Sequence, residues 1–363
     1  MMKTNRTTNR AVRCIPVLLA ILMIFTGCGV QENQPSQRLE TVPFTDSLGR
    51  RVEIPADITR VSPSGGGATM FLECLAPDVL VTMQAKPDEV QLHYLDARLA
   101  QLPVTGSLYG GKSAVNLESL LLAEPQIIID MGEPKEGMID DLNALQETLQ
   151  IPVIFIRADL GAMESAFRTL GTVLPRYKNR ADELAELAAE TLQMAAENCK
   201  QLRPEEQKKV VYGAGPNGLN VHCAGSVNAQ VLETVGAVNG AVLDQVSNKG
   251  TGSPVSMEQW YRFAPDVIFF GDPEACSAVR ESDAWNQLEA IETGAYYPVP
   301  QEPFNWLSTP SSVNTLLGIW WAGNKLYPRL YGYDMVKEAQ RIFRILWQYD
   351  LTEQEARALL QAE

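Results

Sequence analysis

The chain has little histidine and too few basic residues to balance its acidic ones. Its 363 residues include two histidines, His93 and His222, which excludes a histidine-rich metal site. Lys and Arg total 30 against 44 Asp and Glu, for a formal net charge of −14. A protein that neutralises the phosphates of nucleic acid needs a basic surface, so no nucleic-acid partner is expected. A mean hydropathy of −0.10 excludes a multi-span membrane protein.

Long apolar runs are also scarce, and the clearest lies near the N-terminus. Ile15–Phe25 is eleven residues long, too short to span a bilayer as a mature helix, and only basic charges precede it. Phe25-Thr26-Gly27-Cys28 follows and resembles a bacterial lipobox, although Phe25 replaces the usual Leu. We predict a lipoprotein signal peptide over 1–27, lipidation of Cys28 and a flexible tether over 28–42; an uncleaved anchor is the alternative. In either case we expect the protein to be exported and anchored at the outer face of the cytoplasmic membrane, or on its periplasmic side. Cleavage removes four basic residues and no acidic one, so the mature charge is −18.

None of the cysteines has C-x-x-C spacing. Cys74 and Cys199 lie in apolar helical patterns, where buried thiols are expected. Spacing alone does not decide whether Cys74, Cys199, Cys223 or Cys276 forms a disulfide.

The pattern of the mature chain predicts two α/β lobes joined by one long helix. In the N-terminal lobe, 43–175, we expect strands at 60–62, 79–82, 126–130 and 152–156, and helices from Ala68 and at 116–123, 137–149 and 160–174. Continuous apolar strands such as 126–130 are typical of sheets covered on both faces, and their alternation with helices predicts a parallel, doubly wound sheet.

The segment 176–203 is predicted to be a helix that spans the molecule, about 40 Å long at 1.5 Å per residue. Its apolar residues recur at helical spacing, and Pro175 and Pro204 flank it. An ordinary surface helix is the alternative. Alternation then resumes in the C-terminal lobe, 204–363, with strands expected at 209–212, 266–270 and 297–299 and helices at 311–326, 335–349 and 352–361.

An internal repeat relates the two lobes. Asn116-Leu117-Glu118 precedes Pro125 and an apolar strand, and Ser256-Met257-Glu258 precedes Pro265 and another at the same spacing. Asn116 and Ser256 are good helix N-caps, and a Glu in the first turn suits the positive helix end. Two similar lobes imply a cleft in which glycine-rich loops at strand ends approach a ligand.

The order of these motifs resembles the substrate-binding lipoproteins of ABC importers for iron-siderophore, haem and cobalamin. The resemblance runs from about residue 42 through Phe44–Arg50, both Glu…Pro strand entries and the C-terminal Phe304–Ser312 segment. It implies a rigid spanning helix, a small hinge motion and a monomeric, non-enzymatic carrier without a cofactor. It also implies that one exposed Glu per lobe, here Glu118 and Glu258, docks on arginines of a permease dimer. Ordinary helix-start glutamates are the alternative.

The candidate ligand-binding residues are less specific, and each has a structural alternative. They are Ser64, Tyr109, Lys112, Arg157, His222 and Trp306. Trp306 suits stacking on a flat ligand or core packing, His222 suits a ligand contact or a structural role, and Arg157 suits an anionic chelate or a surface salt bridge. Because these side chains are too few to hold bare iron or zinc, a pre-chelated metal is favoured and an oxyanion such as molybdate is the alternative.

The sequence also contains a pattern typical of another class of function. Gly106–Ser113 fits the phosphate-binding pattern G-x-x-x-x-G-K-S, but 102–105 is a poor central strand and the next helix begins only at Asn116. Nucleotide hydrolysis is therefore disfavoured. A cell-surface sensor or adhesion module with the same fold stays open.

Overall fold

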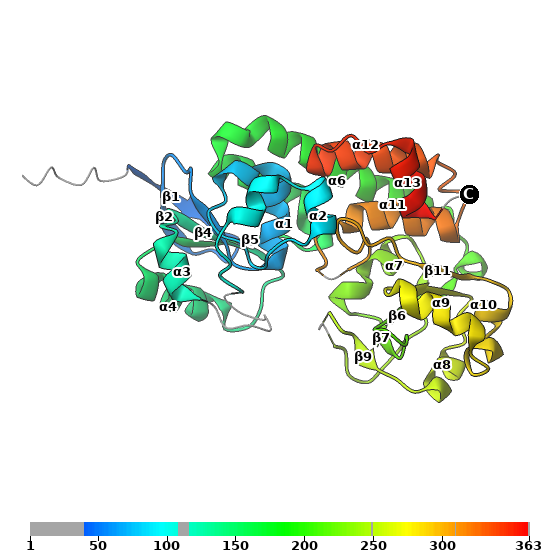
Figure 1. Cartoon of the computed structure of the whole chain (residues 1–363). Helices are drawn as coiled ribbons and strands as arrows, with labels where there is room; N and C mark the ends of the chain where they lie inside the picture. Colours follow the sequence, from blue (N-terminus) through cyan, green and yellow to red (C-terminus); the bar gives the residue numbers. More distant parts are fainter. Residues whose placement is uncertain (1–39, 108–115, 248–249, 309, 362–363) are drawn as a thin grey trace, which may run out of the picture. The chain divides into compact units, whose positions relative to one another are not determined.

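The computed structural model describes residues 40–107, 116–247, 250–308 and 310–361. The predicted signal peptide, Cys28 and most of the tether lie outside these residues. Residues 40–363 form one compact unit, in which Figure 1 shows two separate sheets with helices around them.

The first sheet is parallel, with strand order β3 (Val61–Pro63), β4 (Ile127–Gly132), β5 (Val153–Arg157). Ile127 and Ile129 pack into the main core with helices α1 (Gly66–Leu75) and α5 (Met163–Val173). Ile128 faces the opposite way, onto a smaller core built with α3 (Leu117–Leu122) and α4 (Met138–Leu149). Alternate residues of one apolar strand thus cover both faces, and the predicted doubly wound α/β fold is confirmed.

The strand predicted at 79–82 is wrong. Pro77–Val79 forms a turn of 3₁₀ helix, because a proline at the first position favours a helical turn, and Leu80 makes only an isolated bridge to Val61. Conversely, the hairpin of β1 (Thr41–Thr45) and β2 (Arg51–Pro55) was not predicted as strands.

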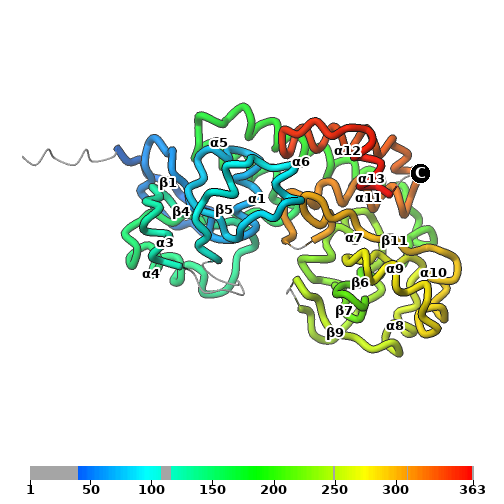
Figure 2. Tube along the Cα trace, in the orientation of Figure 1, coloured from blue at the N-terminus to red at the C-terminus, as the bar shows by residue number. Residues whose placement is uncertain are grey.

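Helix α6 (Lys178–Cys199) is shorter than the predicted 176–203 helix, with 22 residues and a length of about 33 Å. Residues 175–177 form a 3₁₀ turn instead, and the helix ends five residues before Pro204. It packs against α5, α11 (Thr315–Leu326) and α12 (Met335–Trp347), as Figure 2 shows. Its buried face is made of small and apolar residues, with Ala181, Leu184, Ala185 and Ala188 fully buried.

The second sheet is mixed. Strands β11 (Tyr296–Pro298), β10 (Val267–Phe270) and β6 (Lys209–Ala214) run parallel, whereas β7 (Asn220–His222) and β9 (Ser253–Pro254) add antiparallel pairs. The short β8 (Val238–Asn239) pairs with β6. The remaining helices are α2 (Glu89–Tyr94), α7 (Gln230–Thr234), α8 (Met257–Phe263), α9 (Pro273–Ala278), α10 (Glu289–Glu292) and α13 (Glu353–Leu360).

The sequence repeat is also a structural repeat. Asn116 Oδ1 accepts the Ser119 N–H at 2.9 Å, and Ser256 Oγ accepts the Gln259 N–H at 3.4 Å, so both predicted N-caps are confirmed. Helices α3 and α8 then end in the same way, because the residue before each proline is left-handed: Glu124 at φ 45° and Ala264 at φ 41°. Each unit leads into a central parallel strand, β4 or β10.

Close packing around Gly318 in α11 gives a test of this core. A Cβ there would lie 2.1 Å from the Trp306 carbonyl oxygen, which is backbone and cannot easily move. We expect Gly318→Ala to lower the free energy of unfolding by about 1–3 kcal/mol, measured by urea titration. In the control Gly161→Ala, the nearest atom would be at an ordinary 3.5 Å. Equal stability of the two variants would contradict this packing.

Candidate functional site

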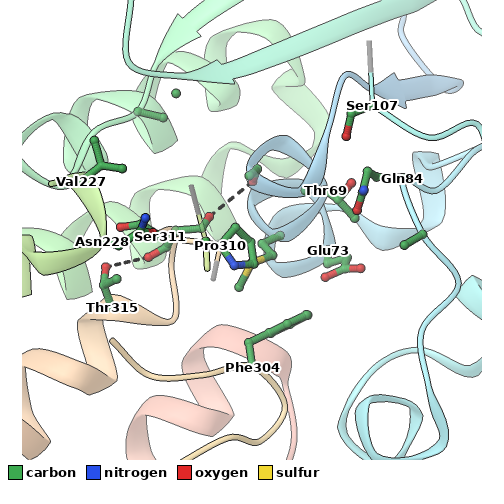
Figure 3. Close-up of a pocket in the computed structure, with 18 of the residues that line it drawn as sticks. Thr69, Glu73, Gln84, Ser107, Val227, Asn228, Phe304, Pro310, Ser311 and Thr315 are labelled. Atoms are coloured by element: carbon green, nitrogen blue, oxygen red, sulfur yellow. Dashed lines mark hydrogen bonds between the residues drawn. The ribbon is translucent and has the colours of Figure 1, made fainter. Parts of the chain in front are cut away.

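A cavity of about 610 Å³ is lined by segments that lie next to the two sheets. We call it the main cavity. Helix α1 contributes Gly66, Thr69, Met70 and Glu73 to its wall. Other lining residues come from later segments, among them Gln84, Lys86, Gln91, Ser107, Glu133, Lys135, Asp159, Met163, Asn228, Gln230, Phe304, Ser311 and Thr315. Figure 3 shows Thr69, Glu73 and Gln84 across the space from Asn228, Ser311 and Phe304.

Hydrogen bonds join the two walls of this cavity. Gln230 of α7 donates through Nε2 to Glu133 Oε1 at 2.9 Å, and Glu133 follows β4. Ser312 donates through Oγ to the Gly67 carbonyl at 3.3 Å, and the Ser312 carbonyl in turn accepts the Thr315 hydroxyl at 2.6 Å. These side chains therefore link segments that lie far apart in the sequence.

The inner wall is rich in methionine. Met70, Met83 and Met163 are all buried, and Phe304 lies opposite as a partly buried ring. Thioether side chains are flexible and polarisable, and they adapt to ligands of irregular outline. This wall therefore suits the apolar body of an organic molecule.

Glu73 is the exception in that wall. It is 6% exposed, and its Oε2 has no hydrogen-bond partner in the described part of the chain. Burial raises the pKa of Glu73 to about 8, because the charged form loses its hydration. The carboxyl is therefore mostly neutral at pH 7 and offers a hydrogen-bond donor to whatever enters the cavity.

A second cavity, of about 540 Å³, shares Gln91, Gly250 and Phe304 with the main one. His222 of β7 lines it and is 1% exposed. Its ring packs on Tyr212, with the two ring centres 4.7 Å apart. Burial lowers the pKa of His222 to about 4, so the imidazole is neutral at pH 7.

The other predicted ligand residues are not brought together. Ser64 is buried and its hydroxyl donates to Asp130, away from both cavities. Trp306 is fully buried and donates through Nε1 to the Glu302 carbonyl at 2.9 Å, so its ring packs in the core rather than on a ligand. Arg157 forms the surface ion pair, with Asp159, that was its alternative interpretation. Tyr109 and Lys112 lie outside the described residues.

The cavity residues that sequence reasoning missed come from α1 and from the chain around residues 84–91, 228–230 and 304–315. One of them carried a visible signal, since Glu73 interrupts the apolar run Met70–Leu75. A charged residue inside a buried helix face needs a partner or a function. Gln84, Asn228 and Ser311 stand in no such pattern.

Glu118 and Glu258 are both exposed, in the first turns of α3 and α8. The Ser256 hydroxyl lowers the pKa of Glu258. The phosphate-loop pattern at 106–113 lies mostly outside the described residues, and Val104 before it makes only an isolated bridge to Met83.

Within residues 40–107, 116–247, 250–308 and 310–361, no group of three or more His, Cys, Asp or Glu side chains could hold a metal ion. The same residues include no helix that is long and apolar enough to cross a membrane. Cys74, Cys199, Cys223 and Cys276 are free thiols, and all but Cys199 are buried.

The raised pKa of Glu73 predicts a pH-dependent stability. Between its ordinary value of 4.5 and about 8, the folded state holds a proton that the unfolded chain loses. Glu73 therefore makes the free energy of unfolding fall as pH rises through this window, by at most about 1.4 kcal/mol per pH unit. We expect Glu73→Gln to remove this contribution, as measured by urea titrations from pH 5 to 9. Exposed Glu289→Gln is the control, and an unchanged pH profile in Glu73→Gln would contradict the assignment.

Comparisons with known proteins agree with this architecture. The periplasmic binding protein family model matches residues 76–303, more than half of the chain. The uncharacterized ABC transporter substrate-binding lipoprotein YvrC of Bacillus subtilis (strain 168) is 22% identical over 327 residues, covering 86% of this chain and 95% of the relative.

Solved structures with the same fold include an ABC transporter solute binding protein from Sulfurospirillum deleyianum. It has a TM-score of 0.80 and 25% identity, over 88% of this chain and 99% of that one. The molybdate-bound MolA of Haemophilus influenzae has a TM-score of 0.68 and 20% identity, over 86% and 99% of the two chains. The resemblance noted in the sequence is confirmed: this chain belongs to the periplasmic binding protein family.

Proposed function

We propose that this protein is the extracytoplasmic substrate-binding component of an ABC importer, and that its cargo is a metal chelate such as a ferric siderophore, haem or a corrinoid. The main cavity carries the proposal. Its volume of about 610 Å³ is that of a site for an organic ligand. The transport role is supported by the similarity to an ABC transporter substrate-binding lipoprotein of Bacillus subtilis and an ABC transporter solute binding protein of Sulfurospirillum deleyianum.

The lining favours a chelate over a bare oxyanion. A tetrahedral oxyanion needs about 100 Å³, a few times the roughly 30 Å³ share of one water molecule, and would leave most of the cavity unfilled. Lys86 and Lys135 would attract it, but the carboxylates of Glu133 and Asp159 line the same space. Apolar contacts with Met70, Met163 and Phe304 suit the organic shell of a chelate instead.

A binding experiment separates these cargoes. Residues 40–363 are titrated with haem, a ferric trihydroxamate, cyanocobalamin and molybdate, with calorimetry as the readout. We expect one of the three chelates to bind with 1:1 stoichiometry, and Phe304→Ala to weaken it about tenfold, equivalent to about 1.4 kcal/mol of lost contact. The control is Val242→Ala, at an exposed residue outside both cavities. Binding of molybdate alone, or of none of the four, would refute the chelate proposal.

The delivery step is proposed to use Glu118 and Glu258. Both are exposed, and both stand at the same position of the repeated helix–strand unit. Two carboxylates on separate, well-anchored helices can each accept a bidentate arginine contact and together set the orientation of docking.

A double substitution tests the docking role. We expect Glu118→Ala with Glu258→Ala to abolish ligand uptake by cells. The affinity of the purified protein for its ligand should stay unchanged, because neither residue lines the main or the second cavity. The matched control replaces Glu289 and Glu353, first-turn glutamates of α10 and α13. Normal uptake by the double variant would show that docking uses another surface.

Attachment to the outer face of the cytoplasmic membrane is part of the proposal. Its support is the basic, apolar and lipobox-like order of residues 1–28. Acylation at Cys28 would hold a body of strongly negative charge near the permease.

A further inference from the structure

The second cavity differs from the main cavity in its charge. Three carboxylates line it, those of Asp88, Asp272 and Glu302, and no lysine or arginine stands among its described lining residues. No ion pair is recorded for these three side chains in the described part of the chain. The main cavity, by contrast, has two lysines among its lining residues.

Each carboxylate already accepts a neutral donor and keeps further accepting capacity. Asp88 accepts the Gln91 N–H at 2.8 Å as the cap of α2, and Asp272 accepts the Glu274 N–H at 2.9 Å as the cap of α9. Glu302 accepts the Tyr94 hydroxyl at 2.6 Å. A carboxylate has about four lone-pair sites, so these bonds leave its charge uncompensated.

Helix capping accounts for the presence of Asp88 and Asp272 in this lining, but it does not account for the buried, unpaired nitrogen of His222. Its Nδ1 is buried without a hydrogen-bond partner in the described residues, and the residue is part of the lining of the same cavity. An unpartnered buried nitrogen costs about 1–3 kcal/mol unless something completes its hydrogen bonding. Since the imidazole is neutral, one of its nitrogens is an acceptor.

We propose that the second cavity is a subsite for a protonated amine, carried by the same ligand whose body fills the main cavity. The two cavities share Gln91, Gly250 and Phe304 in their linings, so they are adjacent, and the proposed ligand would reach from one into the other. This inference rests on the proposed function for the ligand's body, and it narrows the cargo to chelates with a pendant ammonium group.

An ammonium group matches the chemistry of this wall. Its N–H bonds suit the histidine nitrogen and the free carboxylate lone pairs. Its single positive charge is attracted by three acidic residues that have no basic neighbour in the lining. The rings of Tyr212 and Phe304 also line the space, and aromatic faces attract cations. A carboxylate or phosphate would be repelled by the same three side chains.

The test uses small probes, so it does not depend on knowing the whole ligand. The protein has only two histidines, and ¹⁵N-histidine labelling of residues 40–363 therefore gives separate ring signals for His222 and His93. Benzylammonium, benzyl alcohol and benzoate are titrated at pH 7. We expect benzylammonium to shift the His222 signal and not that of His93, with at least tenfold weaker responses to benzyl alcohol and benzoate. A His222 signal unmoved by benzylammonium, or moved equally by all three probes, would overturn the proposal.

A charge-removing variant adds a second criterion. Asn caps helices about as well as Asp, so Asp88→Asn with Asp272→Asn removes two charges and keeps both caps. We expect it to weaken benzylammonium binding about tenfold. The control is Asp334→Asn, which makes the same change at the cap of α12, outside both cavities. Unchanged binding in the double variant, or equal weakening in the control, would contradict the subsite.

The two proposals fail separately. If benzylammonium binds as expected but no chelate binds in calorimetry, the subsite stands and the chelate proposal falls. If a chelate binds but benzylammonium leaves His222 unmoved, the cargo proposal stands and the amine subsite is refuted.

Discussion

The position of the cavity wall depends on one guanidinium group, on a side chain that is 15% exposed. Arg180, near the start of α6, donates through Nε to the Cys74 carbonyl at the end of α1, at 3.2 Å. Its Nη2 donates to the carbonyls of Ile345 and Leu346 near the end of α12. Cationic donors stabilise the unsatisfied carbonyls of helix ends, and here one side chain does so for two helices at once. Helix α1 carries Thr69, Met70 and Glu73, so α6 fixes the wall against which a ligand packs.

Each of the two cavities is lined by a buried polar group whose desolvation lowers the stability of the protein, and a ligand that pairs with this group can restore that stability. Glu73 and His222 are both buried, both neutral at pH 7 and each has an atom without a partner in the described residues. Such groups lower stability in the empty protein because their desolvation is uncompensated. They also favour ligands that restore the missing hydrogen bonds. The specificity for a ligand therefore follows from the polar groups that are left unpaired in the ligand-free protein.

Local patterns predicted the parts of the fold that follow local rules. The apolar strands 126–130 and 152–156 and the paired caps Asn116 and Ser256 were found because period, capping and proline placement are encoded within a few residues. The strand at 79–82 failed because Pro77 imposes a turn on an apolar run, and the antiparallel strands β7 and β9 are too short to show a period.

The candidate site was harder to predict, since it is assembled from segments far apart in the sequence. The sequence predicts a ligand contact at His222 because an imidazole can ligate or hydrogen-bond a ligand, and this residue does line a cavity. Trp306 was selected by residue type, and its indole is used in the core instead. Glu73 and Phe304 acquire their roles from the crossing of α1 with the 304–315 segment, a contact that no local spacing encodes.

The main core cluster has a consequence for how the chain matures. It includes Val52 near one end of the described chain and Leu360 near the other, joined through α1, α6 and α12. The half of the protein that is synthesised first therefore lacks part of its core until α12 and α13 have emerged. Partial chains of this kind stay loosely folded, since the buried area that would stabilise them is incomplete.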